Sequence, residues 1–94
     1  MTVESLTMEL STLFARPADD LVREGLLVFM AKEIRLAESE IADIRERYGA
    51  LSKEALYQAI LDGGIPEHPA WEDYIVWKNK ESHIARLRQL AVQG

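Results

Sequence analysis

Residues 27–48 read LVFMAKEIRLAESEIADIRERY, and this stretch decides the fold. Its apolar residues alternate in spacings of three and four, which places them on one face of an α-helix with heptad character. No proline interrupts the sequence between residues 18 and 48. One helix is therefore predicted over residues 17–48, about 45 Å long at 1.5 Å per residue. The residues of its apolar face are Leu27, Met30, Ile34, Ala37, Ile41, Ile44 and Tyr48.

Both ends of this helix carry local signals. Pro17 suits a first helical turn, and Gly49 supplies a C-terminal stop. Asp43 and Arg47 lie four residues apart with the acid first, which favours an ion pair within the helix. Gly25 does not fit the pattern, because glycine in a helix interior costs about 1 kcal/mol relative to alanine. It indicates either a kink or the close approach of another helix.

The sequence after residue 49 predicts a bend and a returning helix. Ser52 is a good N-cap for a short amphipathic helix that ends at Gly63 and Gly64. A proline-punctuated loop over residues 65–68 follows, and residues 70–92 contain neither proline nor glycine. We predict an all-α protein in which residues 17–94 form a long antiparallel helical hairpin with the short helix at its bend. The returning helix presents a second stripe at Trp77, Ile84, Leu87 and Ala91.

Residues 1–16 form an N-terminal arm whose conformation the pattern leaves open. Apolar residues alternate as in a strand through residues 6–10, and they also recur at helical spacing through residues 3–13. A helix is favoured, since no other segment of the chain is patterned to pair as a strand. The arm and the hairpin together make a single domain.

Composition limits the compartment and the chemistry. The chain has 94 residues and no cysteine, which excludes disulfides, thiol nucleophiles and thiolate metal sites and favours a cytoplasmic protein. The longest apolar run, residues 26–31, is far shorter than the roughly 20 residues that cross a bilayer. Residues 1–6 lack the basic cluster of a signal peptide. We predict no membrane association.

Charge is distributed unevenly along the chain. The net charge is −5, yet residues 74–94 are basic. An acidic chain is a poor unaided ligand for nucleic acid, so contact with DNA is expected only within a larger complex. The alternative is a DNA-binding transcriptional regulator that uses Lys78, Arg86 and Arg88. Lys80 belongs to the same basic segment but projects toward the apolar face.

No motif for catalysis, a cofactor or a metal ion is present. His68 and His83 are the only histidines, and their separation fits no ligand spacing. The acidic group at the start of the returning helix is explained by the positive end of the helix dipole. We therefore predict that the protein is not an enzyme and binds no cofactor.

The first helix is apolar nearly all round at its start, which a two-helix hairpin cannot bury alone. Two explanations stay open: residues 1–14 fold over this segment, or a homodimer buries it. The residues predicted to support self-association are Leu21, Leu26, Val28 and Phe29.

A second excess of apolar residues lies at the start of the returning helix. Trp71 and Ile75 project nearly opposite to the stripe that Trp77 occupies. They either pack under the short helix or anchor another protein, since tryptophan and tyrosine dominate interface hot spots. The residues predicted to bind a partner are Tyr57, Trp71, Tyr74 and Ile75.

Four segments together resemble a known class of proteins. They are ADDLVREGL, IRLAESEIADIRERYG, SKEALYQAILDGG and IPEHPAWEDYIVWKNKE, which fall within residues 18–90. In this order they resemble small helical antitoxins of prokaryotic type II toxin–antitoxin modules. The resemblance implies a non-catalytic protein that binds and neutralises a cognate toxin encoded beside it. A purely structural helical dimer or adaptor is a further alternative.

Overall fold

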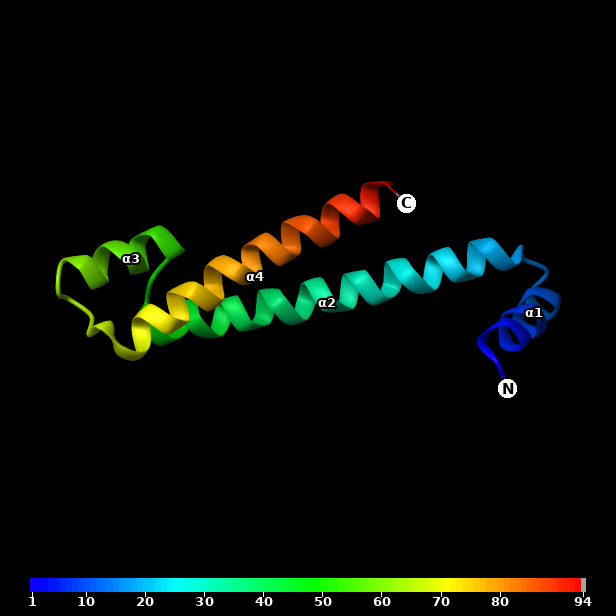
Figure 1. The fold of residues 1–94 in the computed structure, drawn as a ribbon, viewed down its shortest axis with the longest axis horizontal. Helices are drawn as coiled ribbons and strands as arrows, with labels where there is room; N and C mark the ends of the chain where they lie inside the picture. The colour runs from blue at the N-terminus through cyan, green and yellow to red at the C-terminus, as the bar shows by residue number, and fades with distance from the viewer. Residues whose placement is uncertain (94) are drawn as a thin grey trace.

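The chain folds into four α-helices over residues 1–93, the part that this computed structural model describes. In chain order they are α1 (Val3–Phe14), α2 (Ala18–Tyr48), α3 (Lys53–Leu61) and α4 (Glu67–Gln93). No strand occurs within this range, so the all-α prediction is confirmed. Figure 1 shows the helices laid out along a molecule 62 Å long and 25 by 17 Å across.

The two long helices form the predicted hairpin. The chain runs along α2, reverses through α3 and returns along α4 (Figure 1). The predicted apolar faces meet, because Ala37, Ile41 and Ile44 of α2 share one buried cluster with α4 residues. Leu56 and Trp77 are the largest side chains with no exposed surface, so the core is centred near the bend. The other buried members are Ala50, Ile60, Ala70 and Ile84.

Local chemistry determines where α2 ends and α3 begins. Gly49 adopts the left-handed conformation with φ 62°, and its N–H reaches the carbonyl oxygens of Arg45 and Glu46. The Ser52 hydroxyl then accepts a hydrogen bond of 3.1 Å from the backbone N–H of Ala55. Both features match the predicted stop and N-cap. They turn the chain within a few residues and lay α3 against α4.

Ion pairs join the elements at the bend. Arg47 binds Asp73 of α4 at 2.9 Å, rather than pairing with Asp43 within its own helix as its spacing predicted. Lys53 of α3 binds Glu81 of α4 at 2.8 Å. Arg47 therefore connects α2 to α4, and Lys53 connects α3 to α4.

The returning helix begins with an irregular turn. His68 has φ −114° and ψ 130°, outside the helical region, and the bond between His68 and Pro69 is cis. The regular part of α4 therefore follows the prolines, as the predicted helix over residues 70–92 required. Trp71 and Tyr74 lie in its first regular turns.

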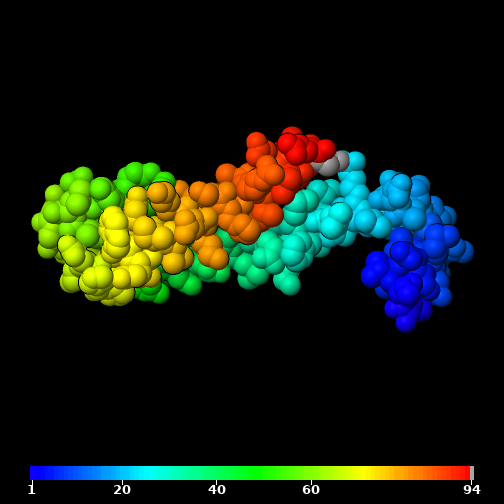
Figure 2. Space-filling model, in the orientation of Figure 1, coloured from blue at the N-terminus to red at the C-terminus, as the bar shows by residue number. Residues whose placement is uncertain are grey.

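The N-terminal arm is helical, so its strand alternative is wrong. A left-handed Ala15 with φ 52° turns the chain, and Pro17 directly precedes α2 instead of lying in its first turn. Arg16, in the turn between α1 and α2, binds Glu24 of α2 at 2.6 Å. Figure 2 shows α1 as a lobe that stands out from this end of the molecule.

The arm does not bury the apolar start of α2. α1 contains no buried residue, and no residue before Ala37 is buried. Leu26 and Phe29 remain 58% and 57% exposed. The explanation that residues 1–14 cover this segment is therefore wrong, because one short helix contacts only one side of α2. A Cβ atom on Gly25 would meet nothing within 4 Å, so no close helix approach within the chain explains this glycine.

Candidate protein-interaction surface

Three aromatic side chains meet on the outside of the bend. Tyr57 comes from α3, while Trp71 and Tyr74 lie three residues apart on one face of α4. The ring centroids are 5.9 Å apart for Tyr57 and Trp71, 5.3 Å for Tyr57 and Tyr74, and 5.5 Å for Trp71 and Tyr74. These distances are typical of favourable aromatic pairs. We call these three residues the aromatic cluster.

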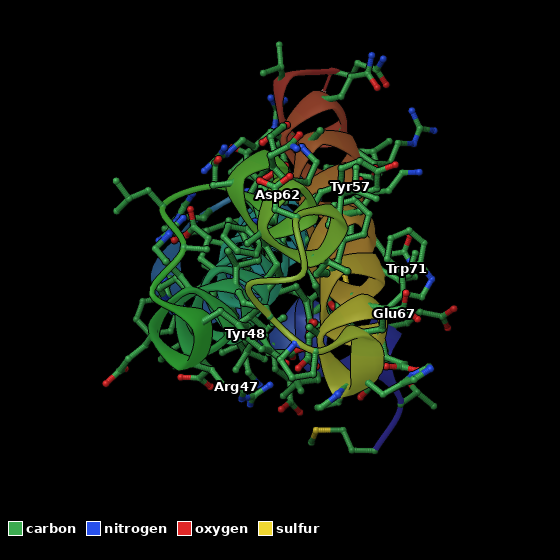
Figure 3. The ribbon with its side chains drawn as sticks, turned by 90° about the vertical axis from the view of Figure 1, so that its left-hand side faces the viewer. Arg47, Tyr48, Tyr57, Asp62, Glu67 and Trp71 are labelled. Carbon is green, nitrogen blue, oxygen red and sulfur yellow. The ribbon has the colours of Figure 1, made fainter. Side chains whose placement is uncertain are left out.

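The fold makes this cluster rigid and partly exposed. Leu56 and Ile60 of α3 point into the core, which leaves Tyr57 on the outer edge of α3, facing α4. Tyr74 packs against the core, whereas Trp71 stays 40% exposed and Tyr57 37% exposed. Figure 3 shows Tyr57 and Trp71 on the same side of the molecule. The cluster therefore has a fixed base and an exposed outer surface.

A recess of about 310 Å³ lies next to Trp71. Ile60, Leu61 and Trp71 supply apolar walls, and Glu67 and His68 supply a polar rim. Leu61 is 61% exposed, so its side chain is accessible to another molecule. Figure 3 shows Glu67 close to Trp71 at this position. The recess has the size and lining to receive a side chain of another protein.

The surroundings of the recess are acidic. Residues 49–73 contain five acidic residues and one lysine. His68 Nδ1 lies 2.7 Å from a Glu72 carboxylate oxygen. The pKa of Glu72 is lowered, first by a hydrogen bond from its own backbone N–H and then by this contact. The rim of the recess therefore carries negative charge at neutral pH.

A hydrogen-bonded group supports the base of α4 on the other side of the bend. The hydroxyl of Tyr48 donates to Asp73, which also accepts from Arg47. Burial, followed by the bond to Asp73, raises the pKa of Tyr48 above its ordinary value. Figure 3 shows Arg47 and Tyr48 away from Trp71, so this group positions α4 without contributing to the aromatic cluster.

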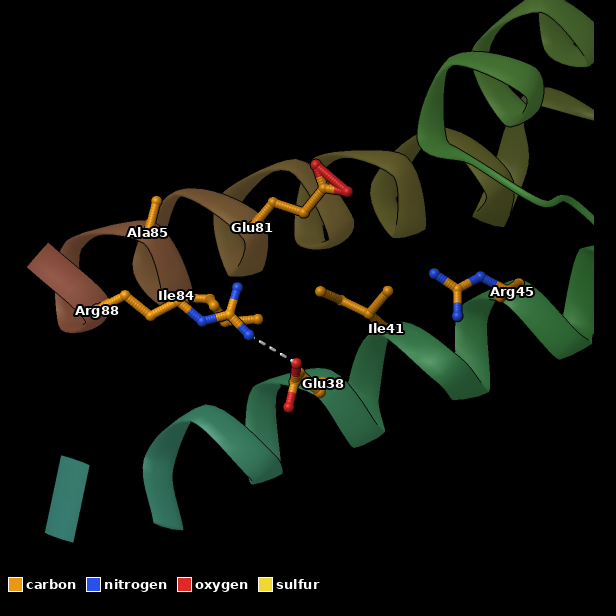
Figure 4. A pocket seen from close by; sticks show the side chains of 7 residues that line it. All are labelled: Glu38, Ile41, Arg45, Glu81, Ile84, Ala85 and Arg88. Atoms are coloured by element: carbon orange, nitrogen blue, oxygen red, sulfur yellow. Dashed lines mark hydrogen bonds and ion pairs between the residues drawn. The ribbon is translucent and has the colours of Figure 1, made fainter. Parts of the chain in front are cut away.

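A second hollow, of about 410 Å³, lies between α2 and α4 and contains charged residues of both signs (Figure 4). Arg88 closes part of it by binding Glu38 at 3.1 Å. Glu81 accepts from the indole N–H of Trp77 at 3.0 Å and from Lys53, and Arg45 lies over the Trp77 ring. Since both carboxylates already have partners, the hollow is a cross-linked seam and a weak candidate for catalysis.

The predicted basic residues are divided between two environments. Lys80 binds Glu40 of α2 at 3.0 Å, as its projection toward the apolar face predicted. Arg88 likewise pairs with Glu38, although its side chain is 62% exposed, and Lys78 and Arg86 are also exposed. The hairpin therefore neutralises part of the charge that the DNA-binding alternative requires.

The predicted partner-binding and self-association residues lie at opposite ends of the molecule. Tyr57, Trp71 and Tyr74 come together, and Ile75 lies next to them on α4 with a partly exposed side chain. The self-association set is at the start of α2, where Leu26, Val28 and Phe29 are exposed and Leu21 is half-buried. Figure 1 shows the distance between these two regions along α2.

Sequence reasoning missed the recess. The acidic group that contains Glu67 is explained by the helix dipole, and His68 falls in the predicted loop over residues 65–68, so neither residue indicated a binding site. Leu61 follows Tyr57 by four residues in α3, so the two share one helix face. That spacing was the available signal, but the position of Glu67 and His68 beside Leu61 depends on the irregular start of α4.

Among residues 1–93, no group of three or more histidine, aspartate or glutamate side chains is arranged to hold a metal ion. No helix in the described part of the chain is both long and apolar enough to span a membrane.

Comparison with known proteins identifies a family. Searches of curated proteins and of solved structures each found no match to this chain. The sequence model of the Uncharacterized protein MJ0235 family matches residues 1–92, and the chain therefore belongs to that family.

Proposed function

We propose that the protein is a non-catalytic, cytoplasmic protein–protein interaction module that binds its partner through the aromatic cluster. The observation that carries this proposal is the packing of the Tyr57, Trp71 and Tyr74 rings against one another beside a recess, with Trp71 still 40% exposed. Rigid, partly exposed tryptophan and tyrosine side chains are typical anchors of protein interfaces. Their fixed base means that binding orders few additional side chains, which lowers the entropic cost of association.

The recess indicates the chemistry of the partner. Its walls are apolar, its rim carries Glu67 and the His68–Glu72 contact, and the surrounding segment is acidic. An arginine or lysine of the partner would lay its aliphatic stem along Ile60 and Leu61 and bring its charge to the Trp71 ring. A basic partner surface would also be attracted by charge complementarity.

We further propose that this partner is a toxin encoded beside the protein, which the protein neutralises by covering its active site. This part rests on the resemblance of residues 18–90 to helical antitoxins. The acidic bend suits a toxin with a basic surface. A DNA-binding role has less support, because Lys80 and Arg88 are paired with carboxylates of α2.

Co-expression tests the proposal. The tagged protein is produced with its neighbouring gene product, and the mass of any purified complex is determined. A stoichiometric complex is expected, and Trp71→Ala should weaken it about 30-fold, which corresponds to about 2 kcal/mol. Leu51→Ala, at an exposed leucine outside the recess lining, is the matched apolar control.

A basic control completes the design. The double substitution of Lys78 and Arg86 by alanine should leave the complex intact. Loss of the complex in this variant but not in Trp71→Ala would contradict the proposed surface. Salt-sensitive DNA binding by the protein alone would favour the regulator, and a stable homodimer without any partner would favour the structural adaptor.

A further inference from the structure

The first third of α2 lies beyond the hairpin. Figure 1 shows α4 diverging from α2 toward its own C-terminal end, with only α1 near the start of α2. The first buried residue of the chain is Ala37, and Val22, Leu26, Val28 and Phe29 are all exposed. Folded single chains rarely leave such a contiguous apolar surface in water.

We propose that a second copy of this chain covers this surface by packing residues 18–36 of the two α2 helices against each other in antiparallel orientation. The interface lies at the opposite end of the molecule from the aromatic cluster. It is therefore independent of the proposed partner, and either proposal can fail without the other.

A second helical seam supports this pairing. Val22, Phe29 and Leu36 recur every seven residues and are exposed, so they form a stripe separate from the hairpin face that contains Ala37. A seven-residue apolar stripe is the pattern by which one helix packs on another. The hairpin uses one seam of α2 and leaves this second seam free.

Gly25 lies on the same side of the helix as this stripe, between Val22 and Phe29. The space around it is open within the chain, since a Cβ atom there would meet nothing within 4 Å. Glycine weakens a helix interior by about 1 kcal/mol relative to alanine. A second helix gives this glycine a role, because it lets a large side chain such as Phe29 of the other copy approach the backbone closely.

Charge complementarity selects a second copy and its direction. Residues 18–26 carry a net charge of −2, from Asp19, Asp20, Glu24 and Arg23, and residues 28–36 carry a net charge of +1, from Lys32, Arg35 and Glu33. Antiparallel pairing brings the acidic end of each copy to the basic end of its mate, whereas parallel pairing places like charges together. The pairing is centred near Leu26.

Mass measurement tests the existence of the dimer. Sedimentation of the full chain at micromolar concentration should give twice the 10.7 kDa of one chain. Phe29→Asp should halve this mass with helicity retained, while the control Leu51→Asp, at an exposed leucine outside the stripe, should leave it unchanged. A monomeric wild type, or a dimer unaffected by Phe29→Asp, would overturn the proposal.

Cross-linking tests the orientation, and it remains informative if Phe29→Asp fails to fold. The chain has no cysteine, so a single introduced cysteine can form a disulfide only with the same position of another copy. With an added oxidant, Leu26→Cys should form a disulfide between copies, because antiparallel pairing brings the two thiols together. Leu36→Cys should not, because its two copies would be about 30 Å apart at 1.5 Å per residue. Equal cross-linking at both positions indicates parallel pairing, and none at Leu26 excludes this interface.

Discussion

The bend and the N-terminal end of this molecule both carry segments that are apolar nearly all round, yet only the bend builds a core. At the bend α2, α3 and α4 converge, and Leu56 and Trp77 lose all their exposed surface. At the other end α1 and α2 meet alone, and nothing before Ala37 is buried. An apolar helix becomes core only where neighbours cover more than one side of it. The N-terminal end is therefore suited to contact another molecule, whereas the bend is suited to hold its aromatic cluster rigidly.

Truncating Trp77 should give the largest difference in stability between the two ends of the molecule. Trp77→Ala removes a fully buried ring from the core and should lower the free energy of unfolding by about 3–5 kcal/mol. Phe29→Ala, the matched aromatic truncation at the other end, should change it by less than about 0.5 kcal/mol at concentrations where the single chain predominates. Urea unfolding followed by circular dichroism measures both. Equal losses would show that the two ends do not differ in packing.

Removing the Tyr48 hydroxyl should have a smaller effect at the bend. The hydroxyl donates to Asp73 and links α2 to α4. Tyr48→Phe should therefore lower the free energy of unfolding by about 1–2 kcal/mol, since the acceptor is charged and the donor half-buried. Glu40→Gln, which weakens the exposed pair with Lys80, should cost less than about 0.5 kcal/mol. A larger loss for Glu40→Gln would place the critical hairpin contact away from the bend.

Gly25→Ala tests the packing at the N-terminal end of the molecule. Within one chain the added methyl group meets nothing, so the substitution should raise the stability of the dissociated chain by about 1 kcal/mol. In the proposed dimer the same methyl group lies between two helices, and dimer dissociation should become easier. Unfolding of this variant measures the stability of the chain, and sedimentation measures the dissociation of the dimer. A variant that is more stable as a chain and unchanged as a dimer would exclude the close approach at Gly25.

Acid should weaken the bend through two glutamates. The pKa of Glu54 is lowered chiefly by the hydrogen bond from Lys53, and that of Glu72 chiefly by its own backbone N–H. A carboxyl group with a lower pKa in the folded chain stabilises it fully above its ordinary value of 4.5, and this contribution disappears as the pH falls through the lower folded value. The free energy of unfolding should therefore fall below about pH 4.5. Glu72→Gln should show a shallower fall, and an unchanged pH profile would contradict this assignment.

The helices and their limits were predictable because they depend on local chemistry. The three-and-four spacing of the α2 face, the left-handed stop at Gly49 and the N-cap at Ser52 act within one or two turns of the chain. The projection of Trp71 away from the stripe of Trp77 also followed from helix geometry, since residues six apart project to different faces. These features need no knowledge of distant segments. Whether Trp71 would pack under α3 or stay exposed did not follow from helix geometry, and the structure leaves it 40% exposed.

Features that depend on contacts between distant segments were harder to predict from the sequence. Arg47 had a suitable partner at Asp43, but the fold brings Asp73 close enough to bind it instead. The recess beside Trp71 requires Leu61 and Glu67 to meet across the irregular turn at His68. The spacing of residues 1–14 correctly favoured a helix, yet it could not show that this helix would leave most of the α2 start uncovered.

Tryptophan quenching in the complex is the most direct test of the proposed interaction surface. In the free protein, the uncharged quencher acrylamide should quench the exposed Trp71 far more than the buried Trp77. Saturation with the neighbouring gene product should protect Trp71, which is measured as a loss of the quenchable fraction of the fluorescence. Trp71→Phe identifies the part of the fluorescence that comes from Trp71. A partner without tryptophan adds no tryptophan fluorescence of its own. Protection of Trp71 is the result we predict. A saturated complex in which Trp71 is quenched as before would contradict binding through the aromatic cluster.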